Sequence, residues 1–263
     1  MGNIFTLGGV GTGSGGGGGG GTNVDMVTTF ESGTNGNPLT VGDLNAATTK
    51  TAAAAGTWTI PVLAPTIDNT GTFVAAPRQF RVSGAGVPDG GTRILRMNTA
   101  ADQIQANYAL TTQAPAASVG FAWYCNPEGT FNFYNWGDIT GTSGGDYNAF
   151  HHFDDSPNST ISSEDGLSNL GTLITIPAPG WYWITMLYDN PNNVVRLRCY
   201  NPSTWAQIGV ESTTSPTLSF DVGSFNVGRT DNHDAFGSNS FYVDYWAMCL
   251  STGVGATWPL LPA

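Results

Sequence analysis

Residues 180–200 read GWYWITMLYDNPNNVVRLRCY and contain two strand-like runs joined by a turn. The turn at 189–193 consists of Asp, Asn and Pro, residues that favour tight turns. The second run, 194–200, alternates, with Arg196 and Arg198 between apolar positions, so it has one wet face and one buried face. The first run is apolar on both faces. This hairpin therefore predicts a central strand of a packed antiparallel sheet and its neighbour.

The rest of the chain continues this pattern of short runs between turn clusters. Such runs, separated by Gly, Pro, Asn and Asp, are typical of an all-β sandwich. Helical periodicity is nearly absent, because only 44–55 is Ala-rich enough to compete and its threonines weaken a helix. The other expected strands cover 79–83, 92–97, 118–125, 130–134, 147–153, 224–229 and 240–250.

The chain carries few charges and a clear acidic excess. Of 263 residues, 10% are charged, with 8 Lys and Arg against 19 Asp and Glu and a net charge of -11. This excess opposes the counterion release that drives nucleic-acid binding. The single lysine, Lys50, excludes a polybasic lipid contact, and no run approaches the ~18 apolar residues of a membrane span. We therefore expect neither a nucleic-acid nor a membrane partner.

Three cysteines, Cys125, Cys199 and Cys249, lie in apolar, strand-like stretches. An odd number cannot all pair within one chain, and their wide spacing matches no zinc pattern. We expect buried thiols, with cysteine acting as a small apolar residue. The alternative is one disulfide with one thiol left over.

Residues 1–28 differ in composition from everything after them. Seven consecutive glycines at 15–21 predict a flexible tether. Before them, Ile4, Phe5 and Leu7 form a short apolar patch, which we interpret as an anchor docked on a neighbouring subunit, since a glycine run cannot bury apolar surface of its own. The start MGNIFT also fits the N-myristoylation pattern, a weak signal in a Gly/Thr-rich arm. We expect 1–28 to be an anchoring arm.

Three stretches share features with a known family: FESGTNGNPLT at 30–40, GWYWITMLYDNPNNVVRLRCYNPSTWAQIG at 180–209 and FNVGRTDNHDAFGSNSFYVDYWAMCL at 225–250. They resemble the first strand, the central hairpin and the closing loop and strand of the concanavalin A-like lectin/glucanase jelly roll, in particular its laminin-G-like branch. The resemblance covers about residues 29–252 and implies a two-sheet antiparallel jelly-roll sandwich over 29–263. Members serve as lectins, glycosidases or adhesion modules, and the fold alone does not choose among them.

Glycosidase chemistry needs two carboxylates on either side of one sugar bond. The glucanase branch of the family supplies them from one strand, in a Glu-x-Asp-x-(x)-Glu arrangement. The chain has no such run, and Asp244 stands alone on its predicted strand. We therefore expect no catalytic residues and no enzyme. The scattered glutamates are Glu31, Glu128, Glu164 and Glu211.

The run FNFYNWGD at 131–138 is the best candidate for a glycan site. Sugar rings present apolar faces and rims of hydroxyl groups, which suit Tyr134 and Trp136 for stacking and Asp138 for hydrogen bonding. The alternative for such aromatics is the core. We expect the core to contain Trp123, Trp181, Trp183 and Trp246.

Calcium is the one cofactor that the residues favour. Asp231, Asn232 and Asp234, in the loop before the closing strand, offer the oxygen ligands that this hard ion prefers. The alternative is a solvated, Asx-rich turn. Asp154 and Asp155 form a weaker second candidate.

Zinc is not expected at His151 and His152, although they lie beside two aspartates. Neighbouring residues of a strand point to opposite faces, so both histidines could serve one metal only across a bulge. We expect one histidine to be buried and hydrogen-bonded and the other to be solvated.

The arm also lacks the basic n-region and apolar h-region of a secretory signal. Together with the low charge, this looks like a bacteriophage virion protein, either a capsid decoration protein or a tail adhesin on the virion surface. The expected partners are a capsid or tail protein, further copies of the chain in a homo-oligomer, and a host surface glycan. The alternative is a secreted, calcium-dependent glycan-binding lectin whose leader has been removed. A degenerate glucanase is the third option.

Overall fold

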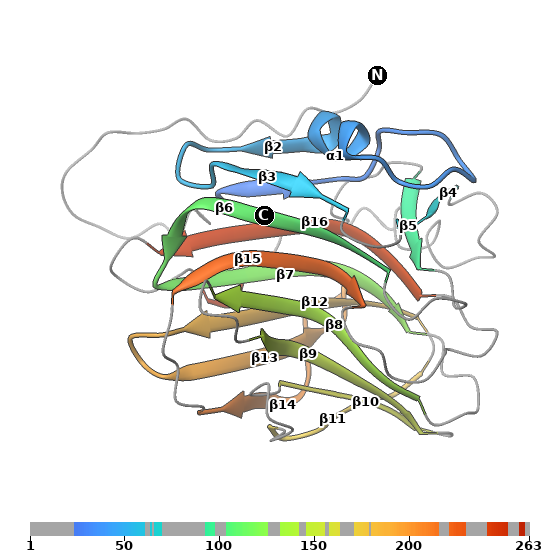
Figure 1. The fold of residues 1–263 in the computed structure, drawn as a ribbon. Coiled ribbons are helices and arrows are strands. Elements are labelled where there is room, and N and C mark those ends of the chain that lie inside the picture. Colours follow the sequence, from blue (N-terminus) through green and yellow to red (C-terminus); the bar gives the residue numbers. More distant parts are fainter. Residues whose placement is uncertain are drawn as a thin grey trace.

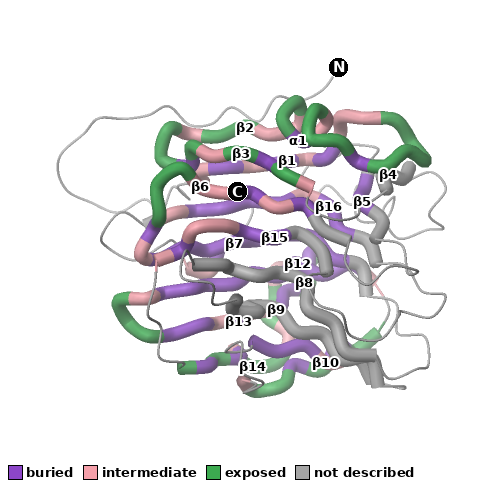
Figure 2. Tube along the Cα trace, viewed as in Figure 1, coloured by how far each residue is buried: buried purple, intermediate pink, exposed green. Residues whose placement is uncertain are grey.

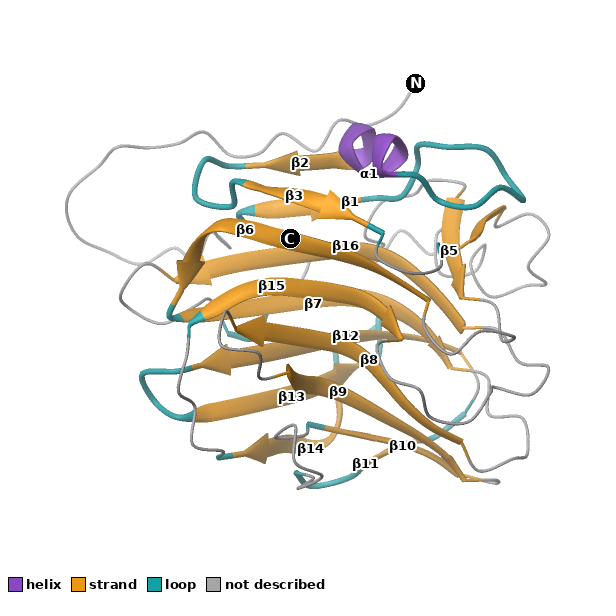
Figure 3. Ribbon diagram, viewed as in Figure 1, coloured by secondary structure: helices purple, strands orange, loops and turns teal. Residues whose placement is uncertain are grey.

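The computed structural model describes residues 24–60, 64, 66–69, 93–97, 104–125, 132–141, 146–155, 158–163, 171–178, 180–215, 221–229, 241–251 and 258–260. In 66–69, 132–141, 146–155 and at the ends of some other strands it describes the backbone alone. Strands dominate this part of the chain, and a single short helix accompanies them (Figure 3). The predicted all-β class is confirmed. No helix among these residues has the length and apolarity to cross a membrane.

The strands form two sheets, which Figure 1 shows as two layers. Sheet A contains β1 (Met26–Thr28), β2 (Thr48–Lys50), β4 (Thr66–Asn69), β5 (Arg93–Met97), β7 (Ala116–Cys125), β12 (Gly180–Asp189), β13 (Val194–Tyr200), β14 (Gln207–Thr214) and β16 (Phe241–Ser251). Sheet B contains β3 (Gly56–Thr59), β6 (Ile104–Ala114), β8 (Asn132–Gly141), β9 (Asp146–Asp155), β10 (Asn158–Ser162), β11 (Ile174–Ile176) and β15 (Val222–Arg229).

Every pairing between described strands is antiparallel. The order in sheet A is β14-β13-β12-β7-β16-β1-β2, and β5 joins it through β16 and carries β4. The order in sheet B is β11-β10-β9-β8-β15-β6-β3. The predicted strand at 79–83 lies outside the described residues. The other predicted strands all overlap strands of these two sheets, but the strand predicted at 130–134 extends to 141 as β8.

The sheets pack face to face as a jelly-roll sandwich around one apolar core. Phe121 of β7 and Trp246 of β16 stack there, with ring centroids 5.0 Å apart. Trp58 of β3 and Tyr108 of β6 bring sheet B into the same cluster, with their centroids 4.9 Å apart. Figure 2 shows that burial concentrates in central strands such as β7 and β12, whereas β2 and β14 at the edges of sheet A carry exposed residues.

The predicted hairpin is present as β12 and β13. Asn193 in the turn has φ of 53°, a left-handed conformation that asparagine tolerates. The Asp189 carboxylate accepts hydrogen bonds from the backbone N–H of Asn192 at 3.3 Å and from its side-chain amide at 2.7 Å. β12 lies between β13 and β7 and is buried from its second residue onward, which confirms the predicted central position.

The helix α1 (Val41–Ala47) begins before the stretch 44–55 that alone showed helical composition. A capping box explains its start. Asp43 N–H donates to Thr40 Oγ1 at 3.1 Å, and Thr40 N–H donates to Asp43 Oδ2 at 3.0 Å. The helix ends where the β-branched Thr48 begins β2, so the threonines do limit it as predicted.

A second buried layer covers the outer face of sheet A, the face turned away from sheet B. Trp183 lies over Gly120, where a Cβ atom would come within 2.5 Å of the indole, so only glycine fits. The C-terminal residues 258–260 lie across this face. Trp183 Nε1 donates to the carbonyl oxygen of Leu260 at 2.9 Å, and Leu260 N–H donates to Thr185 Oγ1 at 3.1 Å.

The tryptophans and the described cysteines are buried as predicted. Trp123 and Trp246 lie between the sheets, while Trp181 and Trp183 lie on the outer face of sheet A. Cys199 is a core thiol, and Cys249 is a thiol in the outer cluster with Leu260. The side chain of Cys125 lies outside the described part of the chain.

Candidate functional site

The predicted glycan-binding residues Tyr134, Trp136 and Asp138 lie on β8, between β9 and β15 in sheet B. The pairing of β8 with β9 shifts register twice, between Asn135 and Gly137 and between Gly137 and Asp138. The first shift omits Trp136 of β8, and the second omits Ala149 of β9. Such irregularities re-aim side chains and are over-represented next to active sites. The structure describes the backbone of β8, so contacts among these three side chains remain a prediction.

The predicted separation of His151 and His152 agrees with the backbone. His151 is opposite Asn135 and Ser162, and His152 is opposite the next residues of the same two neighbouring strands. No register shift falls between the two histidines. The bulge that a shared metal would require is therefore not present at this point of β9.

The predicted calcium ligands Asp231, Asn232 and Asp234 lie outside the described residues. Asp154 and Asp155 end β9, where they pair with β10, and their side chains also lie outside the description. Among the side chains that are described, no group of three or more His, Cys, Asp or Glu could hold a metal ion. Calcium therefore remains a prediction.

The predicted anchor residues Ile4, Phe5 and Leu7 lie outside the described residues, whereas the base of the arm belongs to the fold. β1 lies between β16 and β2. Just before it, Asp25 accepts from the Leu250 N–H at 2.8 Å and from Thr51 Oγ1 at 3.0 Å. Residues 24–28 are thus held by both neighbouring strands of sheet A.

Sequence reasoning missed a pair of amides on the outward face of sheet B, the face turned away from sheet A. Asn107 of β6 and Asn226 of β15 are directly opposite each other, and Asn107 Nδ2 donates to Asn226 Oδ1 at 2.6 Å. Their strand neighbours Tyr108 and Phe225 lie in the core, so both amides face outward. In the sequence each asparagine stands between apolar residues, which was the available signal. Only the pairing of β6 with β15 shows that the two asparagines are neighbours.

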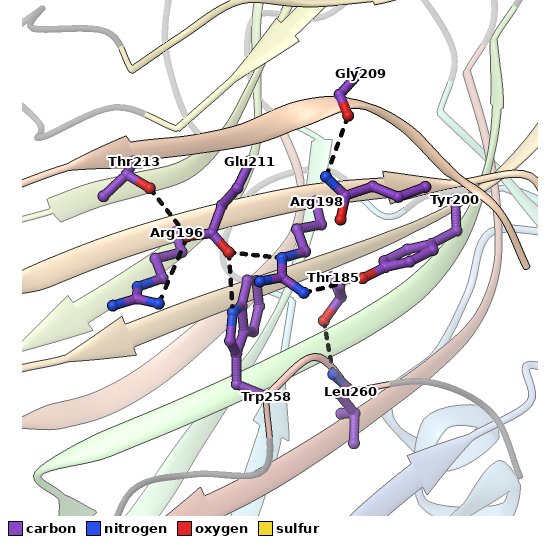
Figure 4. Close-up of polar contacts among 10 residues, drawn as sticks. Thr185, Arg196, Arg198, Tyr200, Gly209, Glu211, Thr213, Trp258 and Leu260 are labelled. Carbon is purple, nitrogen blue, oxygen red and sulfur yellow. Dashed lines mark hydrogen bonds and ion pairs between the residues drawn. The ribbon is translucent and has the colours of Figure 1, made fainter.

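A larger polar cluster lies on the outer face of sheet A and centres on Glu211 of β14 (Figure 4). Its Oε2 accepts from Arg198 Nε at 2.6 Å and from Trp258 Nε1 at 3.2 Å. Its Oε1 accepts from Thr213 Oγ1 at 3.2 Å and lies 3.5 Å from Arg196 Nη1. The Arg198 guanidinium also lies over the Trp258 ring, 5.4 Å from its centroid. This cluster fastens the C-terminal segment to sheet A.

The charges of this cluster stabilise one another. Partial burial raises the pKa of Glu211, but hydrogen bonds from Arg198 and Trp258 and the charges of both arginines outweigh it, so the pKa lies below its ordinary value of 4.5. Burial lowers the pKa of Arg198, but its bonds to Tyr200 and Glu211 raise it overall. Glu211 is therefore ionised near neutral pH, the opposite of a glycosidase general acid, whose pKa is raised.

The buried Asp244 does not form a glycosidase pair with Glu211. Asp244 is buried in β16, four strands from β14 in sheet A. Neighbouring strands are about 4.8 Å apart, so roughly 19 Å separates these two strands. Catalytic carboxylates lie about 5–9.5 Å apart. Glu31 follows β1 in a bend region, and Glu128 and Glu164 lie outside the described residues.

Comparisons with known proteins found solved structures that match this chain with low sequence identity and low TM-scores. No protein-family model matches the chain, and no curated protein matches it. A Lotus tetragonolobus seed lectin matches with 12% identity, covering 63% of this chain and 89% of the lectin at a TM-score of 0.40. The CBM2 module of the evolved Dit of Lactobacillus casei BL23 phage J-1 matches with 11% identity over 59% and 75%, at 0.39. An engineered GH43 glycoside hydrolase matches with 12% identity over 60% and 35%, at 0.41.

Proposed function

We propose that the chain is a non-enzymatic glycan-binding protein that its N-terminal arm attaches to a virus particle. The sandwich binds the glycan on the outward face of sheet B, around β8. The arm, residues 1–23, provides attachment to a capsid or tail protein of the same particle. The alternative is a secreted lectin, in which the same face of sheet B binds the glycan and the arm has no particle partner.

The observation that carries the glycan proposal is the position of the register shifts in β8. The run 134–138 combines two aromatic residues with an aspartate, the residue types that bind sugar faces and hydroxyl groups. Both register shifts of the β8–β9 pair fall within this run. Sequence composition and backbone irregularity therefore coincide at Trp136, in the middle of sheet B and not at its edge.

The observation that favours particle attachment is the way the arm enters the fold. β1 pairs with β16 and with β2, so the chain leaves sheet A from a strand that is hydrogen-bonded on both sides. The side chain of Asp25 adds bonds to Leu250 and Thr51 at the point of exit. A pull on the arm is thus resisted by several hydrogen bonds at once, which suits a load-bearing tether.

The glycan proposal is tested by applying the full chain to an array of neutral and acidic oligosaccharides. We expect Trp136→Ala to weaken binding of the recognised glycan by at least ten-fold, because the apolar face of a sugar ring stacks on an aromatic side chain and this contact supplies much of the affinity. Trp205→Ala is the matched control, since Trp205 is a half-buried tryptophan on the outer face of sheet A. A chelator control shows in the same assay whether calcium contributes.

Two outcomes would contradict the glycan proposal. The first is that the wild-type chain, shown to be folded by circular dichroism, binds no oligosaccharide. The second is that Trp136→Ala and Trp205→Ala reduce binding equally, because β8 would then have no special role. Release of reducing sugar from β-glucans would contradict the non-enzymatic part.

Particle attachment is tested by deleting residues 1–23, which leaves β1 and Asp25 intact. We expect the shortened chain to stay folded and to bind glycan, but to lose co-sedimentation with the particle. A full chain that binds glycan and sediments with no particle would favour the secreted lectin. Equal co-sedimentation of the full and shortened chains would assign attachment to the sandwich instead of the arm.

A further inference from the structure

A row of polar side chains crosses the outward face of sheet B. In β3 the core residue Trp58 is followed by the exposed Thr59, which is opposite Asn107 of β6. Asn107 is in turn opposite Asn226 of β15. The three side chains therefore lie side by side on three neighbouring strands and face away from the core.

The backbone register continues this row into the strand of the proposed glycan site. Phe225 of β15 is opposite Ile139 of β8. Phe225–Ile139 is the last pair of β15 with β8, and Asn226 and Asp138 each lie one residue beyond it along their strands. Asp138 is then opposite Asn148 of β9. Thr59, Asn107 and Asn226 are thus opposite one another on three strands, and Asp138 and Asn148 are opposite one another on the next two.

We infer that Thr59, Asn107 and Asn226 extend the glycan site from β8 across sheet B, so that the ligand is a neutral oligosaccharide lying across the strands and not a single sugar. This inference rests on the proposed function. The inference adds to the proposed function the class of the ligand, the direction in which the ligand lies on sheet B, and three residues outside β8.

The chemistry of the amide pair suits sugar hydroxyl groups. Asn107 donates one of its two amide hydrogens to Asn226 at 2.6 Å, which fixes the orientation of its carboxamide. Asn107 is half-buried, and its amide oxygen and its second amide hydrogen remain to accept from and donate to adjacent hydroxyl groups. Asn226 is buried at 7% exposure, so it acts by holding Asn107 in place. Asn226 is a positioning residue, and Asn107 and Thr59 are the contact residues.

Charge and length define the ligand class. The five positions contain no Lys or Arg, and the whole chain has a net charge of -11, so an acidic glycan would be repelled. Five strands about 4.8 Å apart give a row roughly 19 Å long. A single sugar ring would cover only part of it, whereas a linear oligosaccharide would contact several strands.

The test uses isothermal titration of the full chain with neutral cello-, laminari-, malto- and manno-oligosaccharides, each as the disaccharide and the hexasaccharide. For the series that binds, we expect Asn107→Ala and Thr59→Ala to weaken hexasaccharide binding about three- to ten-fold, the effect of losing a neutral hydrogen bond. The disaccharide, bound at β8, should change by less than about two-fold. Thr175→Ala is the matched control, because Thr175 is exposed on β11 at the far edge of the same sheet.

The outcomes separate this inference from the proposed function. If the wild type binds the hexasaccharide no more tightly than the disaccharide, or if Asn107→Ala and Thr59→Ala bind it as Thr175→Ala does, the inference is overturned while glycan binding stands. If the wild type binds none of the four series, the inference is overturned, and binding on the array of neutral and acidic oligosaccharides then decides whether the proposed function stands. Thermal unfolding of each variant, with a midpoint near that of the wild type, shows that lost binding is not lost folding.

Discussion

Glu211 is the residue that joins the C-terminal segment to two strands of sheet A. Its two carboxylate oxygens face Arg196, Arg198, Thr213 and Trp258, so one side chain connects β13, β14 and the last described residues. Because Arg198 also lies over the Trp258 ring, removing the carboxylate would weaken a stacked contact as well as an ion pair. The remaining attachment is then at Leu260, through Trp183 and Thr185.

The pH dependence of this contact follows from the lowered pKa of Glu211. A carboxylate whose pKa is lower in the folded state adds stability above its unfolded pKa, and this stability is lost as the pH falls through the folded value. We expect Glu211→Gln to unfold more easily than the wild type near neutral pH, by about 0.5–1 kcal/mol given the partial exposure of the cluster. The difference should shrink as the pH falls below 4.5.

Thermal unfolding from neutral pH to about pH 3 measures this difference, with Arg196→Gln as the comparison. Arg196 lies 3.5 Å from Glu211 and Arg198 only 2.6 Å, so the Arg196 variant should lose less stability than Arg198→Gln. A Glu211→Gln variant that matches the wild type at every pH would show that the cluster adds nothing to stability.

For single residues, the sequence predicted which face of a strand a side chain occupies but not which residues it contacts. The alternation of β13 correctly placed Arg196 and Arg198 outward, because strand periodicity is a local property. Their partner Glu211 lies 13 residues from Arg198 on the next strand, and Trp258 lies far along the chain. Such contacts depend on sheet order, which no local pattern contains.

Among the elements, strands with strong apolar patterns were predictable and edge strands were not. β12 is apolar throughout and buried, and its turn to β13 has explicit Asp and Asn chemistry. β14 is an exposed edge strand. Such a strand needs few apolar residues, so the sequence of β14 shows little of the apolar pattern that predicts a strand. β1 has three residues and was assigned to the arm, because its stability comes from pairing with β16 and β2.

The helix shows the same contrast between local and distant causes. Its capping box, Thr40 with Asp43, was readable in the sequence, but seven residues are too few for helical periodicity to stand out. Ala-rich composition pointed instead to 44–55, where the structure begins β2 at Thr48. Burial of Leu44 against the core holds the short helix in place.

For the whole molecule, the sandwich could be predicted from local sequence patterns, whereas the candidate site also depends on the register of the strands. Turn spacing and strand composition suffice for an all-β sandwich, because they are repeated many times along the chain. Trp136 was chosen from composition alone, and the structure adds the register shifts around it. The row from Thr59 to Asn226 joins residues separated by more than 160 positions, so only the assembled sheet shows it.

The most direct test of the central claim, a glycan site on the outward face of sheet B, is hydrogen–deuterium exchange of the full chain with and without a bound neutral oligosaccharide. The account predicts slower exchange in β8, residues 132–141, and in β15, residues 222–229, with no change in β14, residues 207–214. Protection confined to β14 and the other strands of sheet A would contradict it, and so would binding that protects neither β8 nor β15.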